Sequence, residues 1–118
     1  MQPDRQSLKQ VRFVLRVAAQ RDLDAHPEYL DAMADKEAAL RFVDSARASF
    51  DALGNAPHLG PAVPTRNADL GALRKWRIAG FPNYLIYYRP EEEWVRILRI
   101  VHGAQDWWQA LHIASDGE

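Results

Sequence analysis

The stretch from Ala72 to His102, ALRKWRIAGFPNYLIYYRPEEEWVRILRIVH, decides the fold of this 118-residue chain. It contains three runs rich in β-branched and aromatic residues, at 72–79, 84–89 and 94–102, separated by the short links GFPN and PEEE. Links of this length join antiparallel strands into hairpins. In the last run one parity holds Val95, Ile97 and Val101 and the other holds Leu98 and Ile100. Apolar residues on both parities predict a central strand.

Two helical patterns precede this stretch and are joined to it by a loop rich in proline and glycine at 55–71. The first pattern steps through Ala19, Leu23, His26, Leu30 and Met33. We expect Pro27 to kink or split that helix. The second begins after a predicted cap at Asp35 and ends at Gly54, which suits a left-handed cap. Residues 11–17 (VRFVLRV) alternate apolar with basic residues and predict a first strand.

After Gly103, the segment 104–113 predicts a short amphipathic terminal helix. The order strand, helix, helix, three strands, short helix predicts an α+β fold. In it a helical hairpin packs on a mainly antiparallel four-stranded sheet. We expect one domain over 1–118, with flexible ends at 1–10 and 112–118.

Composition removes many functional classes. Hydrophobic residues make up 47% of the chain and charged residues 26%, the profile of one soluble domain. The absence of cysteine excludes disulfides, thiolate metal sites and a cysteine nucleophile. The four histidines lack chelating spacing, and phosphate-loop and hydrolase motifs are missing, so we expect no metal and no cofactor. With no apolar run of membrane-spanning length and no leader, we expect a cytoplasmic protein without a membrane partner.

Charge is distributed unevenly although the formal net charge is only −1. Between Leu70 and His102 there are six basic residues and three acidic ones. Lys75 and Arg77 share one face of their predicted strand and Arg74 lies on the other, so part of this charge must face solvent or a partner. We expect the run Glu91–Glu93 to form a solvated turn. Arg99 and His102 either tie the last strand to the terminal helix or act directly, and both interpretations stay open.

The element order together with LRKWRIAGFPNYLIYYRPEEEWVRILRIVHGAQDW resembles the RelE/ParE superfamily of bacterial toxins, in particular its ParE-like, plasmid-stabilisation branch. The segments AAQRDLDAHPEYL and EAALRFVDSARASFDALGNAPHLG resemble the two helices and the loop of that branch. The resemblance runs from about Val11 to Leu111 and implies a RelE-like fold. Pro27 is a departure, because such toxins usually continue a long helix there.

The resemblance implies the toxin component of a type II toxin–antitoxin system. The implied partner is a cognate antitoxin, with a ribbon–helix–helix domain and a disordered acidic C-terminal segment that folds over the toxin. The residues that we expect to contact the antitoxin are Leu30, Met33, Leu40, Phe50, Trp76 and Tyr87.

Two mechanisms within the superfamily remain open. ParE-like members resemble inhibitors of DNA gyrase that act by protein binding without catalysis. The target-binding candidates under that interpretation are Arg74, Lys75, Arg77, Arg89, Arg99, His102 and Trp107. RelE-like members are ribosome-dependent, metal-independent mRNA endonucleases. Under that alternative, the only one with direct nucleic-acid binding, the catalytic candidates are Arg77, Arg89 and His102.

The sequence favours the gyrase inhibitor. Asp106-Trp107-Trp108 follows His102-Gly103 where an RNA-cleaving relative more often has arginine and then tyrosine. The near-zero net charge is also poor for docking on ribosomal RNA. A third possibility is a degenerate toxin that acts only in autoregulation of its operon.

Overall fold

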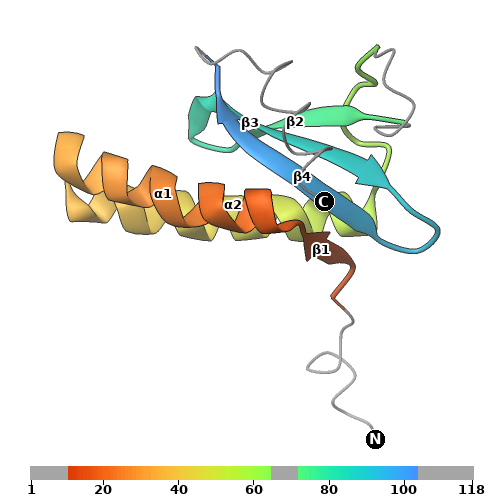
Figure 1. The fold of residues 1–118 in the computed structure, drawn as a ribbon, viewed down its shortest axis with the longest axis horizontal. Helices are drawn as coiled ribbons and strands as arrows, with labels where there is room; N and C mark the ends of the chain where they lie inside the picture. Colours follow the sequence, from red (N-terminus) through yellow and green to blue (C-terminus); the bar gives the residue numbers. More distant parts are fainter. Residues whose placement is uncertain (1–10, 65–71, 104–118) are drawn as a thin grey trace, which may run out of the picture.

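The structure is a computed structural model that describes residues 11–64 and 72–103 (Figure 1). Its elements are β1 (Phe13–Leu15), α1 (Val17–Met33), α2 (Lys36–Asn55), β2 (Arg74–Ile78), β3 (Phe81–Pro90) and β4 (Val95–His102). The predicted α+β class and the order β-α-α-β-β-β are confirmed. The predicted terminal helix at 104–113 and the chain ends at 1–10 and 112–118 lie outside the described residues.

The sheet has the strand order β1-β4-β3-β2. The two hairpins pair β2 with β3 and β3 with β4 in antiparallel fashion, and β1 lies parallel to β4 at one edge. β4 is therefore central, as its two apolar parities predicted. β1 is shorter than the predicted strand over 11–17, because the chain turns into α1 from Arg16, whose N–H donates to the Ile97 carbonyl.

A bulge in β4 changes which residues share a face. Tyr87 pairs with Arg99 and Tyr88 with Ile97, so Leu98 has no partner of its own across the ladder. The strict alternation of faces that the sequence predicted along β4 is wrong after this bulge. Val95, Ile97 and Ile100 pack in the cluster on the helix side, whereas Leu98 and Val101 join the cluster on the opposite side.

The first hairpin link is also shorter than predicted. β3 begins at Phe81, so only Ala79 and Gly80 separate it from β2, and residues 81–83 belong to the strand rather than to the link. Gly80, the second residue of this two-residue link, has a φ of 82°, a conformation that glycine adopts without a steric penalty.

Helix α1 is not split at Pro27, which lies inside it. A proline in this position removes one donor, the bond to the Leu23 carbonyl, and the helix tolerates that loss where its apolar face is packed. Ala19 and Leu23 are fully or almost fully buried against the sheet and hold α1 in place.

Helix α2 begins as predicted, because the Asp35 carboxylate accepts a hydrogen bond from the N–H of Ala38 at 2.7 Å. The predicted left-handed cap at Gly54 is wrong. Gly54 is a buried residue within the helix, and Gly80 is the one glycine with positive φ in the described part of the chain. A Cβ at Gly54 would lie 2.8 Å from Cβ of Arg12, so this glycine lets the segment before β1 cross closely over α2.

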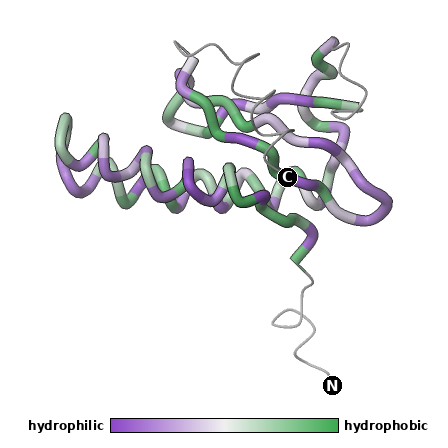
Figure 2. The backbone as a smooth tube through the Cα atoms, viewed as in Figure 1, coloured by the Kyte–Doolittle hydropathy of each residue, from purple (hydrophilic) through white to green (hydrophobic). Residues whose placement is uncertain are grey.

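Both helices lie against one face of the sheet (Figure 1), and hydrophobic and hydrophilic residues alternate along them (Figure 2). The larger apolar cluster fills this interface and includes Phe42, Phe50, Ile86, Tyr88 and Ile97. A smaller cluster on the opposite face combines Leu73, Tyr87, Leu98 and Val101 with half-buried Val63 and Leu85. None of the helices described here has the length and apolarity to cross a membrane.

Candidate functional site

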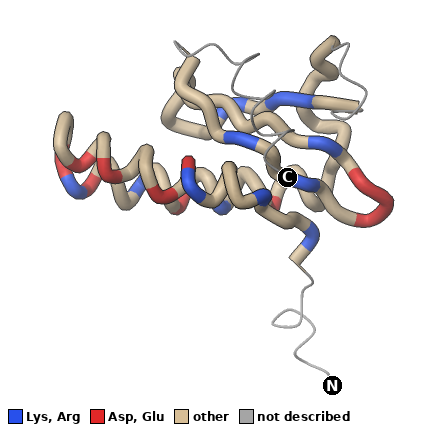
Figure 3. The backbone as a smooth tube through the Cα atoms, viewed as in Figure 1, with Lys and Arg blue, Asp and Glu red and all other residues tan. Residues whose placement is uncertain are grey.

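The basic residues of the sheet divide into those used within the fold and those left at the surface, and Figure 3 shows their spread over the strands. Arg74 belongs to the first group. Its guanidinium donates to the carbonyl of Gly60 and so fastens the loop after α2 to the start of β2. The prediction that Arg74 lies on the opposite face from Lys75 and Arg77 is confirmed.

The buried Tyr88 hydroxyl holds the same loop. It donates to the Pro57 carbonyl at 2.8 Å and accepts from the N–H of Gly60 at 3.0 Å. Burial raises the pKa of Tyr88, and the Gly60 hydrogen bond and the Arg74 charge oppose that rise. Gly60 has no room for a side chain, because a Cβ there would overlap the backbone carbonyl of Lys75.

Arg99 is also engaged inside the protein. Its Nε and Nη2 donate to the Asp22 carboxylate of α1 at 2.6 and 3.0 Å, and the N–H of Ile100 donates to the same carboxylate at 2.8 Å. Nε2 of His26 is 2.7 Å from the Ile100 carbonyl. Side chains of α1 thus bond both the N–H and the carbonyl of Ile100. β1 pairs with β4 only as far as Ile97, so α1 takes its place along the rest of this edge of β4.

Arg89 and Arg96 are cross-strand neighbours that share the Glu91 carboxylate, with Nε–Oε2 distances of 3.1 and 3.4 Å. The guanidinium of Arg96 also lies 5.0 Å from the ring centre of Trp94. The expected solvated turn is therefore correct only for exposed Glu92 and Glu93, since Glu91 is half-buried and ion-paired.

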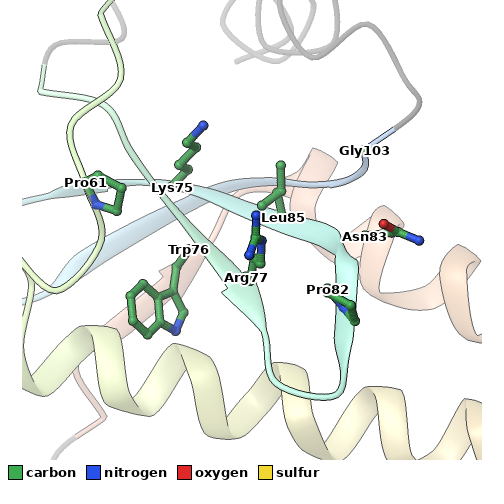
Figure 4. A pocket seen from close by; sticks show the side chains of 8 residues that line it. All are labelled: Pro61, Lys75, Trp76, Arg77, Pro82, Asn83, Leu85 and Gly103. Carbon is green, nitrogen blue, oxygen red and sulfur yellow. The ribbon is translucent and has the colours of Figure 1, made fainter.

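Lys75 and Arg77 differ from these arginines, because both are exposed on β2 and neither side chain makes a hydrogen bond or ion pair within the described residues. They line a cavity of about 550 Å³ on the sheet face opposite the helices. In Figure 4 their side chains and that of Leu85 project to the same side of the β2–β3 hairpin, while Trp76 points toward the helices. Trp76, Asn83, Pro82, Pro61 and Gly103 complete the lining. The site offers two adjacent cations beside an apolar floor.

The three residues of the RNA-cleavage alternative are not brought together. Arg77 pairs with Leu85, and Arg89 lies four residues further along β3, about 13 Å at strand spacing. His102 pairs with Tyr84, which packs in the cluster on the helix side, and the two rings meet edge to face at 4.9 Å. Arg77 and His102 therefore occupy opposite faces of the sheet.

The expected antitoxin contacts are also dispersed. Phe50 and Tyr87 are buried in the two clusters and offer almost no exposed side-chain surface to a partner. Trp76 and Leu30 are half-buried against the helix-side cluster, and Met33 and Leu40 are exposed near the turn between the helices. Trp107 lies outside the described residues.

Sequence analysis missed Asp22 and His26 as partners of β4. The signal was weak, because Asp22 sits on an otherwise apolar helix stripe and is separated from Arg99 by 77 positions. An acidic residue on a buried stripe calls for a cationic or N–H partner, which is the only clue that the sequence held.

Comparison with known proteins agrees with this fold. A family model described as the ParE toxin of the type II toxin–antitoxin system parDE matches residues 13–107. A chain of the solved structure described as the chromosomal ParDE TA system from P. aeruginosa superimposes with a TM-score of 0.63 at 20% identity. The match covers 78% of this chain and 95% of that one. No curated protein matches the sequence.

Proposed function

The chain belongs to the ParE toxin family of type II toxin–antitoxin systems, and on that premise we propose that it arrests bacterial cells by binding DNA gyrase. A cognate antitoxin with an acidic, disordered C-terminal segment neutralises it by covering the same surface. The toxin acts without hydrolysing its target, and its site of action is the cytoplasm, where gyrase is found.

The separation of Arg77, Arg89 and His102 carries the choice of a protein target over RNA cleavage. Cleavage without a metal requires a proton-transferring group and charge-stabilising cations within hydrogen-bond reach of one phosphate. Here the histidine lies on the helix side of the sheet and Arg89 is ion-paired at the far end of β3. The described residues therefore do not assemble that constellation.

Lys75 and Arg77 are the residues that we assign to target binding. Neither side chain has an ion pair within residues 11–64 and 72–103, so binding breaks none there, and an apolar floor such as Leu85 adds buried area beside the two cations. An acidic antitoxin segment would pair with the same two cations and exclude the target. Arg74 and Arg99, engaged by Gly60 and Asp22, serve the fold instead.

The test compares two charge-matched double variants. Lys75→Ala/Arg77→Ala removes the exposed cations of β2, and Arg41→Ala/Arg47→Ala removes two exposed cations of α2. Each full-length chain is added to purified gyrase in a supercoiling assay, and each is induced in cells that lack the antitoxin. We follow labelled thymidine and labelled methionine incorporation in the first minutes.

We expect the wild type and the α2 variant to inhibit supercoiling and to stop thymidine incorporation first. The β2 variant should need at least about tenfold more protein for the same inhibition, since two contacts are lost. Early loss of methionine incorporation with active gyrase would overturn the proposal in favour of mRNA cleavage. Absence of any growth arrest would indicate a regulatory protein.

A further inference from the structure

The cavity beside β2 is lined by groups whose chemistry changes along its length (Figure 4). Lys75 and Arg77 lie two residues apart on one strand, about 7 Å at strand spacing. Leu85 is the β3 partner of Arg77 and supplies the apolar floor at that point. Asn83, two residues before Leu85, lies at the other end, where its carbonyl accepts from the N–H of Gly103. Two cations thus lie toward one end of the cavity and a side-chain amide toward the other.

The charge of this cavity favours an anionic ligand. None of the eight described residues that line it carries a carboxylate. The two neighbouring cations repel each other, and a ligand with more than one negative group would relieve that repulsion. Arginine holds phosphate oxygens in pairs and lysine holds them as a point charge, so Lys75 and Arg77 together suit a chain of phosphates.

The remainder of the cavity suits a flat organic group. Its volume of about 550 Å³ falls within the range of small-molecule sites, and Pro61, Pro82 and Leu85 offer apolar surface to a ring. The Asn83 side chain is exposed and its amide makes no hydrogen bond within the described residues. That amide combines a donor with an acceptor, the pair that binds N7 and the N6 amino group of adenine together.

We propose that this cavity binds an adenine nucleotide, with the phosphates on Lys75 and Arg77 and the base on Asn83. Tyr87 pairs with Lys75 and lies four residues from Asn83, so about 13 Å along the sheet separates the two ends of the site. A nucleoside triphosphate can extend over such a distance. The proposal goes beyond gyrase binding, because it concerns a small ligand that the toxin binds alone. Since the two cations are shared, bound nucleotide excludes the proposed target.

Isothermal titration calorimetry of the full-length protein tests this site, with EDTA present so that no metal neutralises the phosphates. The probes are ATP, GTP, tripolyphosphate and adenosine. Tripolyphosphate has the charge without a base, adenosine has the base without charge, and GTP changes the edge that Asn83 contacts. We expect ATP to bind at least about tenfold more tightly than GTP or tripolyphosphate, and adenosine to give no measurable heat.

A pair of asparagine variants tests recognition of the base. Asn83→Leu removes the amide at similar volume, and Asn55→Leu is the matched control, because Asn55 is an exposed asparagine at the end of α2. We expect Asn83→Leu to weaken ATP binding about tenfold and to leave tripolyphosphate binding unchanged. Asn55→Leu should change neither, and circular dichroism checks that both variants are folded.

The charge-matched double variants test recognition of the phosphates. Lys75→Ala/Arg77→Ala should weaken both ATP and tripolyphosphate at least tenfold. Arg41→Ala/Arg47→Ala, on α2, should change either affinity less than twofold. Both effects should shrink between 50 and 500 mM NaCl, because the cations are exposed.

Four results would overturn the proposal. Absence of saturable ATP binding up to 5 mM would exclude the site, and unchanged ATP binding by Lys75→Ala/Arg77→Ala would place it elsewhere. Equal affinities for ATP and tripolyphosphate would show that the base is not recognised. An oligoadenylate that binds more than tenfold more tightly than ATP would assign the surface to nucleic acid. Gyrase is absent from these titrations, so their failure leaves the supercoiling test unaffected.

Discussion

Replacement of Asp22 by alanine should destabilise this fold more than any other single loss of a carboxylate in α1. The side chain accepts three hydrogen bonds, two from Arg99 and one from the backbone of Ile100, and it is only 11% exposed. Asp22→Ala leaves the Arg99 guanidinium, itself 15% exposed, without this partner, and the N–H of Ile100 without an acceptor.

The magnitude follows from burial. Removal of one member of a buried ion pair costs roughly 3–5 kcal/mol, because the remaining charge stays desolvated. Within that range, the unsatisfied N–H of Ile100 accounts for about 1–3 kcal/mol. With a urea slope near ~2 kcal/mol per M, the unfolding midpoint should fall by about 1.5–2.5 M.

Equilibrium urea unfolding, followed by tryptophan fluorescence and far-UV circular dichroism, measures this change. Asp24→Ala is the matched control, since Asp24 lies on the same helix and its one side-chain hydrogen bond in the described part of the chain comes from exposed Gln20. It should change the free energy of unfolding by less than about 0.5 kcal/mol.

A double-mutant cycle tests the cause. If the cost arises from the loss of the Asp22 carboxylate beside the desolvated Arg99 guanidinium, Asp22→Ala/Arg99→Met should be less destabilised than the sum of the two single variants by about 2 kcal/mol. Additive single effects, or an Asp22→Ala cost below about 1 kcal/mol, would refute the argument that this pair fastens α1 to β4.

Two other features of the fold lead to predictions. Gly60→Ala should lower the free energy of unfolding by about 3 kcal/mol or more, as measured in urea. The new Cβ would overlap the Lys75 carbonyl, and neither group can move aside without a shift of the backbone. Gly80→Ala should lower the free energy of unfolding by only about 1–2 kcal/mol. The new Cβ would meet open space, so the cost is that of placing alanine at a positive φ. Burial raises the pKa of Tyr84, Tyr87 and Tyr88 above the ordinary 10.0. The unfolded chain therefore releases these protons first, so the tyrosine contribution to stability should be constant below pH 9, and urea midpoints should fall as the pH rises through 10. Tyr88→Phe should make that fall shallower, and an unchanged slope would contradict the assignment.

Local patterns predicted the parts of the fold that depend on local energetics. The Asp35 cap, the amphipathic face of α2 and the three closely linked strands were all predictable, because caps, helical periodicity and short links act between residues near in sequence. The central place of β4 followed from apolar residues on both of its parities.

The errors arose where tertiary packing overrides a local preference. Pro27 costs one hydrogen bond, and the packed face of α1 outweighs that loss. Gly54 is a glycine because Arg12 crosses above it, not because the helix ends there. The bulge at Leu98 shifts the parity of Ile100 and Val101, and a bulge depends on the partner strand as well as on its own sequence.

The functional candidates could be chosen from the sequence only as a class. Strand alternation separated Lys75 and Arg77 from Arg74, which the structure bears out. It could not tell which arginines would be engaged within the fold by an ion pair or a hydrogen bond, because the partners Asp22 and Gly60 are distant in sequence. When exposure and side-chain partners are both considered, Lys75 and Arg77 at the cavity are the candidates for target binding that are left among the basic residues of β2, β3 and β4.

Net charge was the weaker of the two sequence arguments against RNA cleavage. The value of −1 conceals a segregation: residues 17–55 carry eight acidic and four basic side chains, and residues 72–103 carry three and six. A basic sheet face attracts anions at short range whatever the total, since screening limits each field to about 10 Å. The proposal of a protein target therefore depends on the arrangement of these groups, with His102 and Arg77 on opposite faces of the sheet. The same segregation gives the sheet an excess of basic side chains and the helical hairpin an excess of acidic ones.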